Sequence, residues 1–165
     1  VAEIGAISER RMALLLDTGL SGLPAFLIRD SGVNSGFMIA QVTAAALAAE
    51  NQCLAHPSSV TSLPTSANQE DHVSMATYGA RRLADMVNNA AVVVGDAAMA
   101  AAQGIEFDRS LKSSPLIEAQ FAAIRQRVAF LEQDRYLAPD IDAMREWALQ
   151  ADWPAPLRAC QPSHA

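Results

Sequence analysis

One long stretch decides the fold: residues 71–104 read DHVSMATYGARRLADMVNNAAVVVGDAAMAAAQG. The stretch contains no proline, and alanine, the strongest helix former, is its commonest residue. We therefore predict a helix from near Asp71 to about Gln103, with Gly104 as its stop. Such a helix spans on the order of 50 Å, which exceeds the usual helix of a compact domain and indicates the rods of a larger helical assembly. Two internal glycines are expected to kink this helix or to permit close helix contacts: Gly79 and Gly95.

Shorter helices are predicted on both sides of this rod, wherever apolar residues recur at helical spacing: 1–17, 37–54, 115–131 and 139–151. The 37–54 helix is apolar on nearly every side, which predicts that other helices surround it. Segments 18–36 and 55–67 are rich in glycine, proline and hydroxyl residues and are predicted as loops, with residues 26–28 anchoring the first loop to the core. The result is an all-α, long-helix bundle over residues 1–151, followed by an extended or frayed tail over 152–165.

The composition indicates that much of this bundle is covered by other protein. Hydrophobic residues make up 51% of the chain and charged residues 18%, with a mean hydropathy of +0.12. We expect other subunits, or the rest of a longer polypeptide within which this chain begins, to hide part of the surface. The net charge is −6 and no Lys/Arg-rich run occurs, so the chain would repel phosphate backbones and we expect no nucleic-acid partner.

No membrane or metal site is expected either. Polar residues interrupt the most apolar stretch, 37–54, at positions that lipid would tolerate poorly: Gln41, Thr43, Glu50, Asn51 and Gln52. Cys53 and Cys160 give neither a disulfide framework nor metal-ligand spacing, so each is interpreted as a small buried hydrophobe, and a reducing cytoplasm suits them. No self-sufficient catalytic motif occurs, and the three histidines are far apart, each expected in a structural or surface role: His56, His72 and His164.

A dense polar cluster lies directly before the long helix, where residues 63–75 read LPTSANQEDHVSM. In the structural interpretation Ser66 or Asn68 caps the helix, and Glu70 and Asp71 favour the positive end of its dipole. Caps are far commoner than active sites, so composition alone favours this interpretation. The functional interpretation notes that capping needs one or two polar groups, whereas this segment supplies five in a row. A carboxylate held near a helix start in an apolar bundle can serve as an acid/base or substrate-orienting group.

Two long segments resemble stretches of histidine ammonia-lyases: residues 34–47, NSGFMIAQVTAAAL, and residues 66–75, SANQEDHVSM. The similarity also covers IGAISERR at 4–11 and AAQG at 101–104, and it extends over about residues 1 to 150. The resemblance implies an almost wholly helical fold in which long helices of four subunits pack into a homotetramer. It also implies non-oxidative elimination of ammonia from L-histidine to give trans-urocanate, with an electrophilic 4-methylidene-imidazol-5-one (MIO) group formed from an internal Ala-Ser-Gly.

The matching motifs assign roles to individual residues. Glu70 matches a catalytic glutamate that reaches into the active site, either to contact the substrate imidazole or to help proton transfer. Met38 matches a residue that lines the substrate pocket, and Gln69, adjacent to Glu70, is a weaker candidate for substrate binding. Glutamate rather than glutamine at position 70 favours histidine as the substrate, because a carboxylate accepts a hydrogen bond from an imidazole N–H and a phenyl ring offers no such donor. Asp71 and His72 are assigned to orientation and capping.

One feature of the family is missing from this sequence. Ala-Ser-Gly occurs nowhere in it, so the MIO group must be supplied by a segment not present in this chain, and the isolated chain is predicted to be inactive. Three hypotheses stay open: part of a histidine ammonia-lyase that is completed by another segment, a related aromatic amino-acid lyase or aminomutase, or a non-catalytic helical assembly module.

Overall fold

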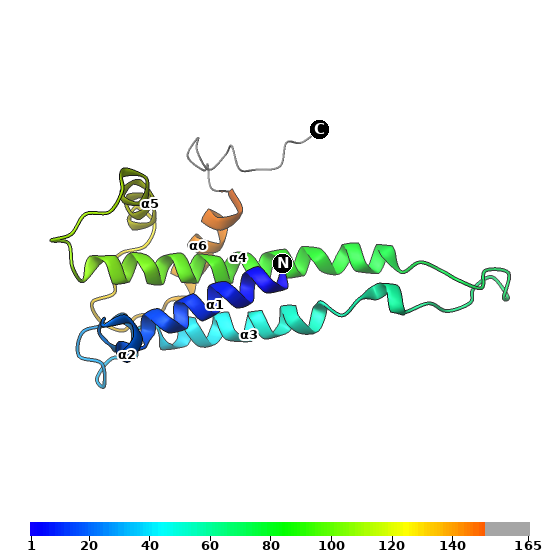
Figure 1. Cartoon of the computed structure of the whole chain (residues 1–165), viewed down its shortest axis with the longest axis horizontal. Coiled ribbons are helices and arrows are strands. Elements are labelled where there is room, and N and C mark those ends of the chain that lie inside the picture. Colours follow the sequence, from blue (N-terminus) through cyan, green and yellow to red (C-terminus); the bar gives the residue numbers. More distant parts are fainter. Residues whose placement is uncertain (151–165) are drawn as a thin grey trace.

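The computed structural model describes residues 1–150 and shows an elongated bundle of helices (Figure 1). In chain order the elements are α1 (Ala2–Leu16), α2 (Thr18–Ser21), η1 (Ala25–Leu27), α3 (Met38–Leu54), η2 (Ser58–Val60), α4 (Ala76–Glu106), α5 (Pro115–Arg125) and α6 (Ala138–Gln150). Helix α4 runs most of the length of the molecule. Helices α1 and α3 pack against it and against each other, while α5 and α6 lie on its other side. The described part of the chain contains two isolated β-bridges and no strand, which confirms the all-α prediction.

The long helix forms as predicted, but both of its ends differ from the prediction. It begins at Ala76 rather than near Asp71, because the residues before it form a hairpin-like turn with positive φ at Ser66, Ala67 and Asn68. It ends at Glu106, so Gly104 lies within the last turn and is not the stop. A β-carbon at position 104 would lie 3.0 Å from a methyl carbon of Leu23, so this glycine serves close packing instead.

Gly95 confirms the expectation of a close helix contact. It faces α6, and a β-carbon built there would lie 2.8 Å from the backbone carbonyl carbon and oxygen of Met144. Backbone atoms cannot yield as a flexible side chain can, so only glycine permits this approach of α4 and α6.

The core lies where α1, α3, α4 and α6 meet, and it is built from apolar side chains of every one of these helices: Met12, Leu16, Ala40, Ala44, Val93, Met99, Ala100, Met144 and Trp147. Hydrogen bonds of polar side chains also join α1, α3 and α4. The Gln41 side-chain amide of α3 donates to the Glu9 carboxylate of α1 at 2.7 Å, and the buried Asn51 amide donates to the Met86 carbonyl of α4 at 3.0 Å. Paired in this way, the buried polar groups set the register of the three helices.

The prediction that the 18–36 loop is anchored to the core is confirmed, since Leu27 and Ile28 are fully buried. The helix predicted over 115–131 starts as expected, with the Ser114 hydroxyl accepting from the Ile117 N–H, but it ends at Arg125. Val128 and Leu131 are still buried. They reach the core from an irregular segment, 126–137, which we call the strap.

Helix α3 is covered on one side only, so the prediction that other helices surround it is not met within this chain. Its buried face carries Ala40, Ala44 and Ala48, while Ile39 is 63% exposed and Cys53 is also exposed. The prediction of a buried Cys53 is therefore wrong for this chain, because the cysteine lies away from α1 and α4. None of the described helices is long and apolar enough to cross a membrane. The predicted tail, with Cys160 and His164, lies outside the described residues.

Candidate functional site

The loop that carries Glu70 projects beyond the ends of α3 and α4 (Figure 1). Thr65 and Glu70 exchange backbone hydrogen bonds of 3.0 and 3.3 Å, and the Gln69 N–H donates to the Ser66 carbonyl at 3.2 Å. Three successive non-glycine residues adopt positive φ to close this turn: Ser66, Ala67 and Asn68. Because left-handed backbone is disfavoured for such residues, the turn is a strained and specific structure. The Glu70 and Gln69 side chains are exposed at its tip.

Capping does not explain this polar cluster. Helix α4 starts at Ala76 after Met75, which makes no side-chain cap, and its first turn contains no acidic residue. The Ser74 hydroxyl accepts the Ala76 N–H at 3.3 Å. The capping roles expected for Ser66, Asn68, Asp71 and His72 and the dipole role expected for Glu70 are therefore wrong, because none of these residues caps α4 or lies in its first turn.

A hydroxyl-rich pocket of about 270 Å³ lies at the base of this loop. Its lining includes His72 together with Ser58, Ser59, Thr61 and Ser74. The Val73 N–H donates to the Ser62 hydroxyl at 3.0 Å, which joins the segment that returns from the loop to the segment that enters it. Neither Gln69 nor Glu70 lines this pocket, so both side chains are free to face another molecule.

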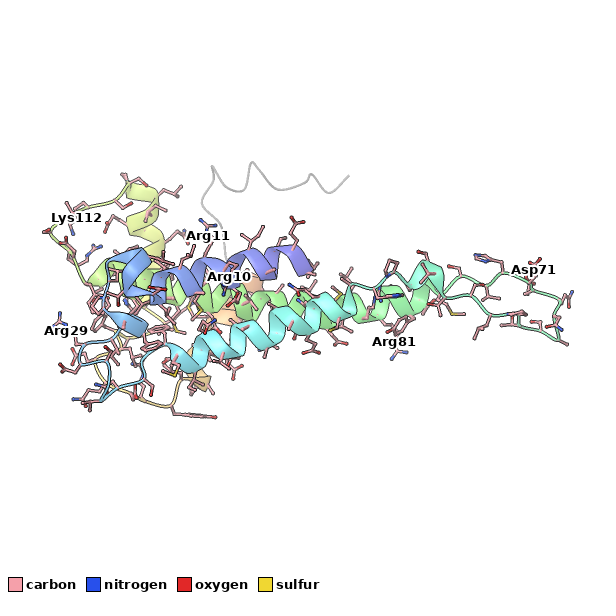
Figure 2. The ribbon with its side chains drawn as sticks, turned by 60° about the horizontal axis from the view of Figure 1, so that its bottom comes forward. Arg10, Arg11, Arg29, Asp71, Arg81 and Lys112 are labelled. Atoms are coloured by element: carbon pink, nitrogen blue, oxygen red, sulfur yellow. The ribbon has the colours of Figure 1, made fainter. Side chains whose placement is uncertain are left out.

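Met38 lies far from Glu70. It is the first residue of α3, and the 17 residues of that helix alone span roughly 25 Å before the chain enters the projecting loop. Figure 2 shows the same separation, with Asp71 at one end of the molecule and Arg29 at the other. Within one copy of the chain, the structure therefore brings Gln69 and Glu70 together but leaves Met38 at the opposite end.

The turn in front of Met38 is held by a residue that the sequence analysis missed, Asp134. Its carboxylate accepts the Ser35 N–H at 2.7 Å and the Gly36 N–H at 2.8 Å, and these backbone N–H groups hold the pKa of Asp134 below its usual value. Asn34 completes the contact by accepting the Asp134 N–H on its side-chain oxygen at 3.2 Å. No local pattern could have identified this contact, because the partners are about a hundred residues apart in the sequence.

A buried amide joins the strap to the core. The Gln103 side chain donates to the carbonyls of Leu27 and Leu131, both at 3.0 Å, and accepts the Leu131 N–H at 3.1 Å and the Arg125 guanidinium at 3.3 Å. All four hydrogen-bonding positions of the amide are thereby used. The position of the strap, and of Asp134 within it, thus depends on the C-terminal end of α4.

A second missed residue is Asp96, which is fully buried in α4. Neither of its carboxylate oxygens has a hydrogen-bond partner, and burial raises the pKa of Asp96 to about 7. A sequence signal existed, since Asp96 stands one helical turn from Val93, Met99 and Ala100 on the apolar stripe of the helix. Among residues 1–150 there is no cluster of His, Cys, Asp and Glu that could hold a metal ion.

Comparison with known proteins gives consistent matches over most of the chain. The family model described as aromatic amino acid lyase matches residues 1–126. The histidine ammonia-lyase of Paracidovorax citrulli is 87% identical over 163 residues, which cover 99% of this chain and 32% of that protein. The histidine ammonia-lyase of Desulfotalea psychrophila is 64% identical over 141 residues, 86% of this chain and 28% of that protein. The chain thus spans about a third of the length of the curated relatives it matches.

Solved structures share the fold. The crystal structure of histidine ammonia-lyase from Trypanosoma cruzi aligns with a TM-score of 0.86 and 39% identity, over 95% of this chain and 33% of that one. Tyrosine aminomutase from Streptomyces globisporus aligns with a TM-score of 0.85 and 35% identity, over 89% of this chain and 28% of that one. The helical bundle is therefore a shared architecture of enzymes with different reactions.

Proposed function

Because the chain belongs to the aromatic amino acid lyase family, we propose that it forms part of a histidine ammonia-lyase, which converts L-histidine to trans-urocanate and ammonia. The observation that carries this proposal is the 87% identity to a histidine ammonia-lyase over 99% of the chain. The fold alone does not decide the substrate, since an aminomutase aligns almost as well. The glutamate at position 70 favours histidine over substrates with a phenyl or phenol ring, because its carboxylate can accept a hydrogen bond from an imidazole N–H.

Glu70 is the proposed catalytic residue of this chain. Its carboxylate is exposed at the tip of a turn that two backbone hydrogen bonds to Thr65 hold in shape. A group presented in this way can enter a pocket on another molecule and either bind the substrate imidazole or take part in proton transfer. Gln69, on the same turn, is the proposed secondary contact to the substrate.

We further propose that the pocket forms between copies of the chain, within a homotetramer. Met38 begins α3 and Glu70 lies on the loop beyond its other end, so a pocket that contains both takes them from different copies. Exposed apolar side chains along the bundle support such an assembly, among them Ile4, Ile7 and Val42. The cytoplasm is the proposed compartment, which suits the free thiol of Cys53.

The cofactor of the proposed reaction cannot come from this chain. An MIO group forms from Ala-Ser-Gly, which is absent from the sequence, so no residue present here fits it. The proposal therefore requires another segment of the complete enzyme to supply the electrophile. If the reading frame that contains this chain encodes no Ala-Ser-Gly, the lyase proposal fails and a non-catalytic helical module becomes the better explanation.

The decisive experiment assays the complete enzyme for urocanate from L-histidine, and for cinnamate and coumarate from phenylalanine and tyrosine. Urocanate as the sole product supports the proposal, and either of the other products would establish the alternative lyase. The Glu70→Gln variant is expected to lose activity by about a hundredfold or more at unchanged thermal stability, the usual scale for a general acid or base. Glu146→Gln on α6, which also removes one exposed carboxylate, serves as the control and is expected to keep full activity. Near-normal kinetics of Glu70→Gln would exclude a catalytic role for this glutamate.

A further inference from the structure

We propose that Asp134 is a positioning residue of the substrate pocket: its carboxylate holds the turn over residues 34–37 and thereby sets the place of Met38. The inference rests on the proposed function, because it takes Met38 as a contact to the substrate. Asp134 itself does not need to touch the substrate. It acts through the backbone of the turn that leads directly into α3.

The contact is a three-bond clamp between distant parts of the chain. The two carboxylate oxygens of Asp134 accept the N–H groups of Ser35 and Gly36, at 2.7 and 2.8 Å, and the backbone N–H of Asp134 donates to Asn34. Hydrogen bonds to an ionised acceptor are roughly twice as strong as neutral ones. Two adjacent N–H groups on one carboxylate also define an orientation, which a single bond could not do.

The clamped turn has little freedom to adopt another shape. Gly36 has a φ of 56°, and a β-carbon there would lie 2.5 Å from the Phe26 carbonyl oxygen. That same oxygen accepts the Phe37 N–H at 3.0 Å, and the Phe37 side chain is buried. The Met38 N–H then donates to the Ser35 carbonyl at 3.1 Å. Met38 therefore follows the clamped backbone without an intervening flexible residue.

Helix α3 lacks a capping side chain of its own at this end. Phe37 at its N-cap position makes no side-chain cap, and the first turn contains no acidic residue. The Asp134 carboxylate is bound immediately upstream, where a negative charge is also favoured by the positive end of the helix dipole. The clamp thus fixes the backbone directly before α3, where the helix has no cap of its own.

Contacts other than the clamp hold the strap in place, so Asp134 positions the turn and the turn does not position Asp134. On one side of it, Leu131 is bound through both its N–H and its carbonyl by the buried Gln103. On the other side, the Arg135 guanidinium donates to the carbonyls of Ala129 and Phe130, at 3.1 and 3.3 Å, and to the Asp140 carboxylate at 2.7 Å. The place of Met38 is therefore determined from the C-terminal end of α4, through the strap.

A double-mutant cycle in the complete enzyme tests this inference. The variants are Asp134→Asn, Met38→Ala and the combination of both, and Asp142→Asn on α6 is the control because it also neutralises a largely exposed aspartate. Asparagine matches aspartate in shape but turns an N–H group toward one of the two backbone donors. We expect Asp134→Asn to raise KM for L-histidine by about tenfold, the equivalent of one charged hydrogen bond, and to change kcat by less than about threefold. In the Met38→Ala background, the same change should raise KM by less than about twofold.

A second variant keeps the test valid if Asp134→Asn fails to assemble. Asn34→Ala removes the weaker side of the clamp, together with the 3.4 Å bond from the Asn34 amide to the Arg29 carbonyl. It should raise KM by about two- to threefold, again without effect in the Met38→Ala background. Hydrogen exchange of the peptide that contains residues 35 and 36 should accelerate in Asp134→Asn and remain unchanged in Asp142→Asn.

Equal KM effects of Asp134→Asn with and without Met38, or a loss of stability at unchanged KM, would overturn the inference and leave Asp134 a structural residue. So would an unchanged KM in Met38→Ala, because Met38 would then not contact the substrate. Failure of the unmodified enzyme to form urocanate would instead overturn the proposed function, and the inference with it.

Discussion

Replacing Asp96 by asparagine is expected to remove a pH dependence that is built into the core. Asp96 lies on the buried stripe of α4, and both of its oxygens lack a hydrogen-bond partner. Burial is the cause of its raised pKa, since no charged neighbour contributes. Its side chain is already sealed within one chain, so a neighbouring copy could reach it only by displacing helices.

The magnitude follows from the difference between the folded and unfolded states. The pKa of Asp96 is about 7 in the fold, against an ordinary value of 3.8. Between these two values the folded chain binds more protons than the unfolded chain, so the free energy of unfolding falls as the pH rises. Each pH unit is worth about 1.4 kcal/mol, so the full loss between about pH 4 and pH 7 amounts to about 4 kcal/mol.

Asparagine does not titrate and therefore abolishes this loss. Near pH 8 the Asp96→Asn variant should be more stable than the unmodified chain by about 2–4 kcal/mol. Near pH 4 it should be equal or slightly less stable, because its amide stays buried without a partner. Urea unfolding followed by circular dichroism at both pH values measures the difference. Asp85→Asn, an exposed site on the same helix, is the control for general charge effects.

The result that would refute this reasoning is an identical pH dependence in the unmodified chain and in Asp96→Asn. It would mean that the carboxyl finds water or a partner when it ionises, so that its burial carries no energetic penalty. A greater stability of the variant at low pH only would contradict the sign of the effect.

Three substitutions test the packing of α4. Gln103→Met is close to isosteric but leaves the N–H and carbonyl of Leu131 buried without partners. It should therefore lower the free energy of unfolding by about 3–5 kcal/mol in urea titrations. An effect below about 1 kcal/mol would show that the strap is held by other contacts. Gly95→Ala places a methyl group against the Met144 backbone and should cost about 1–3 kcal/mol in the same measurement. Gly104→Ala, which meets only the flexible end of a side chain, should cost less, and the reverse order would contradict the proposed tight contact.

The helices were predictable because their signals are local. Alanine-rich composition, helical spacing of apolar residues and the Ser114-Pro115 start predict α1, α3, α4, α5 and α6, and the structure contains all five. The errors occurred where distant contacts intervene. Helix α4 starts five residues after the predicted start because of the turn at Ser66–Asn68. No glycine in this turn indicates its positive φ values in advance. The 115–131 helix ends early at Arg125, where the strap turns toward Gln103.

The candidate site shows the same division. Its residues, Glu70, Gln69 and Met38, were identified from motifs and remain predictions. Only the structure showed that the capping interpretation fails and that Met38 lies at the other end of α3 from Glu70. No local sequence pattern indicates the clamp by Asp134, since the N–H groups that its carboxylate accepts are 98 and 99 residues away.

The sequence by itself thus determined the fold class, the long rod and the motif residues, because a helical hydrogen bond joins residues only four positions apart. The tertiary structure decided which groups meet: the buried and unpaired Asp96, the Gln103 junction and the carboxylate clamp in front of Met38. The Gln103 and Asp134 contacts join side chains to backbone groups across tens of residues. They exist only after the helices have packed.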